Sequence, residues 1–233
     1  MSAKQTSIRR WLVISVSMIA TMILLGLSYW QYSKIAPKDA AIALIESRMT
    51  LPPTAFPARP EALADWHYRV VSAEGRYIPQ YARHIYRAGP SGRPGYHLLV
   101  PFARLSAPAI WVDLGWFDRT LKPKFETPAL PLDITPMIGQ IQPRQRNAKL
   151  VTPPAPDIAQ NIFYRIQPDV LGQGTDLEAL TGIYLISPIA MLKGLEVVPP
   201  PVKLEHNHRS YAIQWLAMAV GLVVITIAFL RKR

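Results

Sequence analysis

Two long runs without a charged residue lie near the two ends of this chain. They cover residues 11–30 and 211–230, and each contains 20 residues. At about 1.5 Å of rise per residue, a helix of that length spans about 30 Å, the thickness of a bilayer's hydrocarbon core. The pattern therefore predicts two transmembrane helices. A cleaved signal peptide is disfavoured for the first run, because its apolar stretch exceeds the usual core of about 7–15 residues and no small-residue cleavage site follows.

The flanks of the two runs predict their orientation. Basic residues precede the first run and follow the second, and such flanks mark the cytoplasmic side of a membrane. Aromatic residues gather at the opposite ends of both runs, where a membrane–water interface favours them. We therefore expect residues 1–10 and 231–233 in the cytoplasm and residues 31–210 outside it.

Small residues predict where the two helices approach each other. Ser17 and Thr21 on the first run, with Ala217 and Gly221 on the second, are short enough for close packing. Ordinary lipid-facing positions are the alternative interpretation of these four residues.

Between the runs, shorter elements predict one compact domain. Residues 37–49 place Ile42, Ile45 and Met49 three or four positions apart, which predicts an amphipathic helix, and the prolines of residues 51–60 end it. Seven segments rich in β-branched or aromatic residues predict strands, at residues 68–78, 81–87, 96–105, 110–117, 134–142, 161–167 and 182–189. Their spacing predicts an antiparallel sheet or a partly closed barrel. The expected fold is thus an α+β membrane protein, with two transmembrane helices flanking an antiparallel β-rich extracytoplasmic domain.

The net charge of +11 does not indicate a nucleic-acid-binding protein. Six of the 26 Lys and Arg flank the apolar runs at the chain ends, whereas all 15 acidic residues lie between the runs. No cluster of basic and stacking aromatic residues is present, so we expect no nucleic-acid partner. The chain has no cysteine, which excludes disulfides, thiolate metal sites and cysteine nucleophiles.

Catalytic patterns are scarce, and we expect that this protein is not an enzyme. The sequence has no phosphate-binding glycine loop, no G-x-S-x-G and no H-E-x-x-H. We interpret Asp113 and Asp118 as solvated or turn-forming carboxylates, and His67, His84 and His97 as surface or hydrogen-bonded side chains. If the chain were an enzyme, His97 and Asp113 would be the first residues to test.

Residues 205–215, EHNHRSYAIQW, place polar and metal-capable groups at a membrane boundary. Such groups cost free energy there unless something satisfies or uses them. If a helix begins near Asn207, a favourable N-cap, one stripe of about 100° carries five residues: His208, Tyr211, Ala212, Trp215 and Ala219. An imidazole, aromatic rings and small residues are groups that a porphyrin site uses.

Arg209 lies beside the histidine, and Lys34 and Trp30 lie at similar depth on the first run. Cations at this boundary can pair with the propionates of a haem. Two alternatives stay open. His208 can simply cap the helix or bind headgroups, with the aromatic residues forming an interfacial belt. His206 and His208 can also form an H-x-H copper site, although their spacing suits an extended segment rather than one helix face.

Two motifs lie at the predicted outer ends of the apolar runs, at a similar depth in the membrane. Residues 27–34, LSYWQYSK, fit the pattern L-G-x-W-Q-x-x-R, with Ser28 at the glycine and Lys34 at the arginine. Residues 207–215 fit N-H-x-x-Y-A-x-T-W, with Gln214 in place of the threonine.

Two further motifs lie between them. Residues 95–101 fit G-Y-x-x-x-x-P, and residues 112–116 fit V-N-R-G-W, with Asp113 and Leu114 replacing the asparagine and arginine. With these four motifs in order, the chain resembles the SURF1 family (Surfeit locus protein 1) over nearly its whole length. Members of this family are membrane factors for the assembly of haem–copper cytochrome c oxidase.

The resemblance implies that the protein receives haem a from haem a synthase and assists its insertion into subunit I of cytochrome c oxidase. It further implies His208 as the axial ligand of the haem iron, with Trp30, Tyr211 and Trp215 as pocket residues and Arg209 or Lys34 as propionate partners. The short N-terminal segment favours a bacterial inner membrane over a mitochondrial one. The alternative is a scaffold that binds oxidase subunits and no haem.

Overall fold

A computed structural model describes residues 3–89, 92–145, 154–199 and 206–231. The chain forms two compact units. The first consists of Met1–Leu44 and Val202–Arg233, and the second of Ile45–Pro201. The predicted proline-rich loops at 151–156 and 199–201 lie largely outside the described residues.

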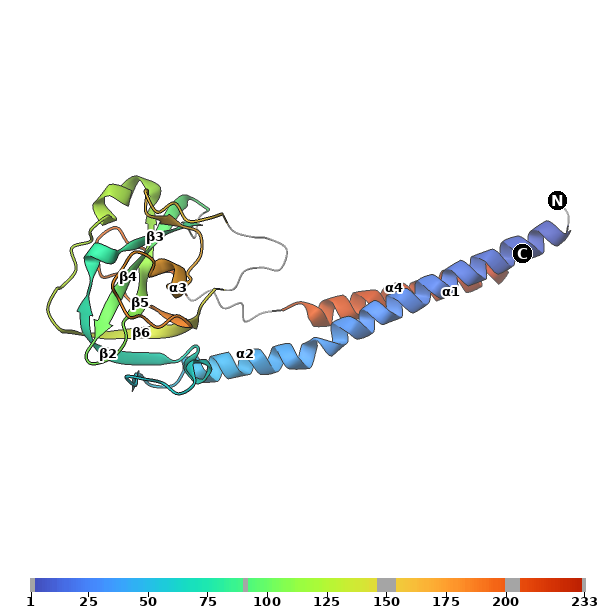
Figure 1. The fold of residues 1–233 in the computed structure, drawn as a ribbon. Helices are drawn as coiled ribbons and strands as arrows, with labels where there is room; N and C mark the ends of the chain where they lie inside the picture. Colours follow the sequence, from blue (N-terminus) through green and yellow to red (C-terminus); the bar gives the residue numbers. More distant parts are fainter. Residues whose placement is uncertain (1–2, 90–91, 146–153, 200–205, 232–233) are drawn as a thin grey trace. The chain divides into compact units, whose positions relative to one another are not determined.

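The first unit is a pair of long antiparallel helices. Helix α1 covers Ala3–Ser33 and helix α4 covers His208–Arg231, and the two run side by side (Figure 1). Helix α2, Ile35–Met49, follows α1 directly and agrees with the amphipathic helix predicted at 37–49. Both apolar runs are therefore helical as predicted. The described chain has two helices long and apolar enough to cross a membrane, whereas the crossing itself stays a prediction.

Small residues form the contact between α1 and α4, but not all of those predicted. Ala212 and Ala219 are buried, and the Ser28 hydroxyl donates a 2.9 Å hydrogen bond to the Ala212 carbonyl. Ala217, in contrast, is exposed. The reason is helical periodicity: positions 212 and 219 are seven residues apart and share one face, from which 217 is rotated away.

The described residues of the second unit form eight strands and several short helical segments. The strands are β1 Thr54–Ala55, β2 Val70–Tyr77, β3 Arg83–Ala88, β4 Pro94–Arg104, β5 Ile110–Asp118, β6 Thr135–Pro143, β7 Ile162–Phe163 and β8 Ile183–Ile186. The helical segments are η1 Leu63–Trp66, η2 Pro79–Tyr81, η3 Arg119–Phe125 and α3 Pro168–Leu171.

All seven predicted strands exist, although two are shorter than expected. The segment 161–167 contributes only β7, because the chain bends at Tyr164 and Arg165 directly after it. The segment 182–189 stops as a strand at Ile186, shortly before Pro188, which cannot donate to a ladder. Strand β1, within the proline-rich stretch, was not predicted.

Five strands close into a barrel. The neighbours in order are β2, β6, β8, β5 and β4, and a further pairing between β2 and β4 completes the ring. Of the two predicted forms, the barrel is confirmed. Its pairing is not antiparallel throughout, because β5 pairs with β8 in parallel, as do β1 with β2 and β3 with β7. A closed ring of five strands cannot alternate in direction throughout, since five is odd. One parallel pair is therefore a geometric necessity, and β5–β8 supplies it.

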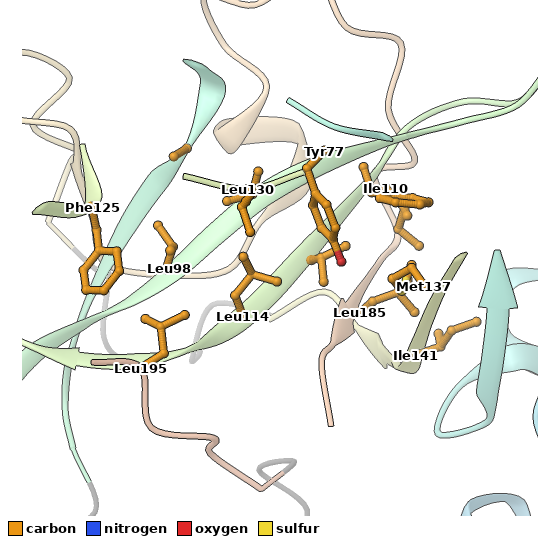
Figure 2. Close-up of a cluster of buried hydrophobic side chains, with 14 of the residues drawn as sticks. Tyr77, Leu98, Ile110, Leu114, Phe125, Leu130, Met137, Ile141, Leu185 and Leu195 are labelled. Atoms are coloured by element: carbon orange, nitrogen blue, oxygen red, sulfur yellow. The ribbon is translucent and has the colours of Figure 1, made fainter. Parts of the chain in front are cut away.

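The barrel is packed with apolar side chains on both faces. Alternate residues of the ring strands meet inside it, among them Leu98, Leu114, Ile141 and Leu185 (Figure 2). A second cluster on the outer face includes Leu99, Trp111, Tyr184 and Ile186, and residues of α3 and β7 cover it. This double cover explains why β4 and β5 are apolar at nearly every position instead of alternating.

A β-bulge in β5 explains the 112–116 motif. The register between β4 and β5 slips by one residue between the pairs His97–Trp116 and Leu99–Asp113. Gly115 takes the extra position with φ of +121°, and a Cβ there would lie 2.6 Å from the Glu196 carbonyl oxygen. Only glycine adopts this conformation in this space without strain.

Asp113 holds the bulge from within. Its Oδ1 accepts a 3.0 Å hydrogen bond from the Gly115 amide, and its Oδ2 lies 2.8 Å from His97 Nδ1. Both side chains are buried. Of the two interpretations given for the carboxylates, Asp113 is turn-forming and not solvated, because it is buried and accepts the amide two residues further on. Asp118 forms a turn in the same way, accepting the Thr120 amide at 3.0 Å.

His84 is hydrogen-bonded, as predicted. It is fully buried and its Nε2 donates to the Phe125 carbonyl at 2.9 Å. Burial lowers the pKa of this imidazole, so it stays neutral inside the domain. It therefore serves the packing of η3 against the barrel.

We predict that Asp113→Ala lowers the free energy of unfolding by about 1–3 kcal/mol, because the Gly115 amide and the His97 ring lose their acceptor inside the core. Asp113→Asn keeps an acceptor oxygen for Gly115 and is expected to cost less. Denaturant unfolding followed by tryptophan fluorescence measures both variants. Equal losses in the two variants would contradict the role of the Gly115 hydrogen bond.

Candidate ligand-binding site at the start of α4

Helix α4 begins at the polar stretch that the sequence marks. The first helical residue is His208, and the Asn207 carbonyl accepts the Tyr211 amide at 3.0 Å as the first hydrogen bond of the helix. Asn207 thus occupies the predicted cap position. His206 and Asn207 lie in the non-helical lead-in.

The His208 imidazole is oriented by α1. Its Nδ1 lies 2.8 Å from Oε1 of Gln31, near the end of α1. An amide oxygen only accepts hydrogen bonds, so the Nδ1 atom carries the proton in this contact. In the neutral ring, Nε2 then keeps its lone pair and is free to ligate a metal. Metal-binding histidines commonly have this arrangement, with the second nitrogen held by an outer acceptor.

Asp39 of α2 organises the polar residues around the lead-in. One of its oxygens lies 2.7 Å from His206 Nε2, and the other accepts a 2.7 Å bond from Arg209. The charge of Arg209 is therefore already balanced by a carboxylate. This pairing was not predicted, and it makes Arg209 less available to an anionic ligand.

The two histidine rings are adjacent, and the ring of His206 already has a partner. Their centroids are 5.1 Å apart, but His206 turns its Nε2 toward Asp39. Within the described ranges there is no group of three or more His, Cys, Asp or Glu side chains able to hold a metal ion. An H-x-H site would accordingly need ligands from elsewhere.

The predicted aromatic residues fall into two sets. Trp215 is half-buried on the face that carries Ala212 and Ala219, so it lies at the helix interface. Tyr211 and Trp30 are 48% and 52% exposed and lie outside that contact. Lys34 is exposed, with its Nζ 6.0 Å from the centre of the Trp30 ring, an arrangement that a cation–π attraction favours.

Sequence reasoning missed the parts played by Gln31 and Asp39. Gln31 does stand in the 27–34 motif, and it lies three residues beyond Ser28 on the same face of α1. That spacing was the available signal that Gln31 faces α4. Nothing in the local pattern around Asp39 pointed to a partner more than 160 positions away.

The model of the SURF1 family matches residues 18–220, a region that includes both Gln31 and His208. This chain belongs to the SURF1 family. The prediction from the four motifs is thereby confirmed.

Relatives with SURF1-like names cover nearly the whole chain. A SURF1-like protein of Rickettsia felis is 26% identical over 93% of this chain and 96% of its own length. A SURF1-like protein of Mycobacterium bovis is 24% identical over 96% of this chain and 86% of its own length. The cytochrome oxidase assembly protein SHY1 of Saccharomyces cerevisiae is 25% identical over 51% of this chain and 31% of its own length.

Proposed function

We propose that this protein is a membrane-anchored assembly factor for cytochrome c oxidase that binds haem a through His208 and passes it to subunit I. Family membership supports the assembly role, because the yeast relative carries that role in its name. The single observation that supports haem binding is the His208–Gln31 hydrogen bond, which leaves Nε2 available to the iron.

In this proposal, α1 and α4 cross the inner membrane of a bacterium and both termini lie in the cytoplasm. The bacterial relatives and the two apolar helices support the membrane location. The barrel then lies in the periplasm, where it docks on the oxidase subunit. His208 then lies at the outer boundary of the membrane.

The residues at the start of α4 suit a transiently held haem. A neutral imidazole is an axial iron ligand, and Gln31 fixes its tautomer and direction. Trp215 lies on the same face and can flank the macrocycle. Of the two predicted propionate partners, Lys34 is the more available, because Asp39 already pairs with Arg209.

The role requires no covalent chemistry from the protein. A carrier must release its cargo, and one imidazole ligand in an open site permits release more readily than a closed cage with two. Haem a synthase is the expected donor and subunit I the expected acceptor. The second candidate function is a scaffold without haem, in which the contacts of His208 and Asp39 serve only to hold the helices together.

We predict that His208→Ala reduces the haem a content of the purified protein at least about tenfold, since the iron loses its only protein ligand in this proposal. The measurement is the Soret absorption of protein purified from cells that make haem a. His206→Ala is the matched control and is expected to keep most of the haem. Wild-type protein that co-purifies with oxidase subunits but carries no haem would favour the scaffold.

We predict that Gln31→Leu weakens haem a binding by about 10–100-fold, because the imidazole loses the acceptor that orients it. Gln31→Glu keeps an acceptor oxygen and is expected to retain tighter binding than the leucine variant. Haem titration measures the affinities, and thermal unfolding of the haem-free protein shows whether the fold is unchanged. Wild-type affinity in both variants contradicts the orienting role.

The absence of native cysteine allows a direct test of topology. We predict that Gln173→Cys, in an exposed turn of the barrel unit, reacts with a membrane-impermeant thiol reagent in intact spheroplasts. Arg231→Cys, at the end of α4, is expected to react only after the membrane is permeabilised. Labelling of both positions in intact spheroplasts would overturn the two-span arrangement.

A further inference from the structure

An apolar cleft lies between α1 and α4, well away from His208. Its volume is about 260 Å³. Ser17, Met18 and Thr21 line it from α1, and Val223 and Ile227 line it from α4. The hydroxyl of Thr226, which also borders it, donates to the Leu222 carbonyl of its own helix at 2.8 Å. The cleft therefore presents a mainly apolar lining to whatever enters it.

The cleft exists because short side chains on α1 face a stretch of α4 that does not pack closely against them. At Ala219, which is only 1% exposed, the helices touch. One helical turn further along α4, Val223 is 41% exposed and stands opposite a region of α1 that carries Ser17 and Thr21. Ser17 and Thr21 were predicted as close-packing residues, and here they line a space instead.

The cleft and the candidate haem site share one helix pair. His208 and Val223 are both on α4, and 15 residues of helix separate them by about 22 Å. The buried Ala212 and Ala219 lie between the two positions. An extended ligand whose head lies at His208 would reach the cleft with an apolar tail that runs along the outside of this closed helix contact.

Haem a is a ligand with these two parts. Its propionates lie on one edge of the porphyrin, and a hydroxyethylfarnesyl chain extends from the opposite side. With the propionates near the water boundary, the farnesyl chain points along the helices toward the apolar interior. A mainly apolar cleft suits such a chain, whereas it has no charged side chain to pair with the polar edge of the macrocycle.

We propose that the cleft between α1 and α4 binds the farnesyl tail of haem a while His208 ligates the iron. This inference rests on the proposed function, because it concerns the same cargo. It adds a basis for selectivity: haem b has no such tail and gains nothing from the cleft. Haem o has the tail without the formyl group, so it is expected to behave like haem a in this respect.

The test titrates the full-length protein in lipid nanodiscs with haem a, haem o and haem b. The wild type is expected to bind haem a and haem o about tenfold or more tightly than haem b, as added apolar groups in a fitting pocket allow. Ser17→Leu fills the cleft and is expected to remove most of this preference while leaving haem b binding unchanged. Thr226→Leu fills the cleft from α4. It provides an independent test in case the Ser17→Leu variant does not fold.

Ser15→Leu is the matched control, because Ser15 is an exposed residue of α1. It is expected to keep the wild-type preference. Equal affinity of the wild type for the three haems, or an unchanged preference in both filled variants, shows that the tail does not bind in the cleft and overturns the inference while the carrier role stands. Failure of the wild type to bind any haem overturns the proposed function and the inference together.

Discussion

The hydrogen bond between His208 and Gln31 joins two helices that are separated by most of the sequence. Neither residue lies deep in an apolar run: each stands near the end of a helix at the predicted water boundary. At that depth, an unsatisfied polar group costs free energy and a satisfied one fixes register. The other residues at the contact of α1 and α4, the small Ala212 and Ala219 and the half-buried Trp215, are not paired by charge. The His208–Gln31 hydrogen bond and that of Ser28 with Ala212 are therefore two polar contacts that fix which residues of the helices face each other. The direction of the His208 lone pair follows from that register.

The barrel depends on a comparable polar contact in its core. Asp113 binds the Gly115 amide and the His97 ring at once, and the bulge it stabilises turns β5 so that Trp116 and Phe117 change faces relative to regular alternation. The asparagine of the related motif can accept the same amide bond through its side-chain oxygen. Asp113 is therefore compatible with the bulge and presents a carboxylate, in place of an amide, to His97. Leu114 points into the barrel, where an apolar side chain packs well.

Patterns with local causes were predictable from the sequence. The two apolar helices, the amphipathic α2 and the seven strand segments each follow from spacing, turn residues and composition within a short window. The parallel β5–β8 pair was not predictable in this way, since it follows from the number of strands that close the ring. Similarly, Asp39 and His206 lie 167 positions apart, and no window of sequence contains both. His208 was found through its place in a motif, whereas its partner Gln31 required the register between helices.

A carrier faces two opposing requirements, which are to hold its cargo against loss to the membrane and to give it up on contact with the acceptor. A single strong site meets the first and fails the second. Two weaker contacts with one molecule, an axial imidazole bond and an apolar tail contact, act together in the proposed carrier. When one contact is formed, the effective concentration for the second is high, so the cargo is held well although each contact alone dissociates easily. A receiving protein that offers its own iron ligand then needs to replace only one of these contacts at a time. The separation of about 22 Å along α4 between His208 and the cleft makes such stepwise release geometrically reasonable, because the iron end and the tail end are exposed to an acceptor at different depths.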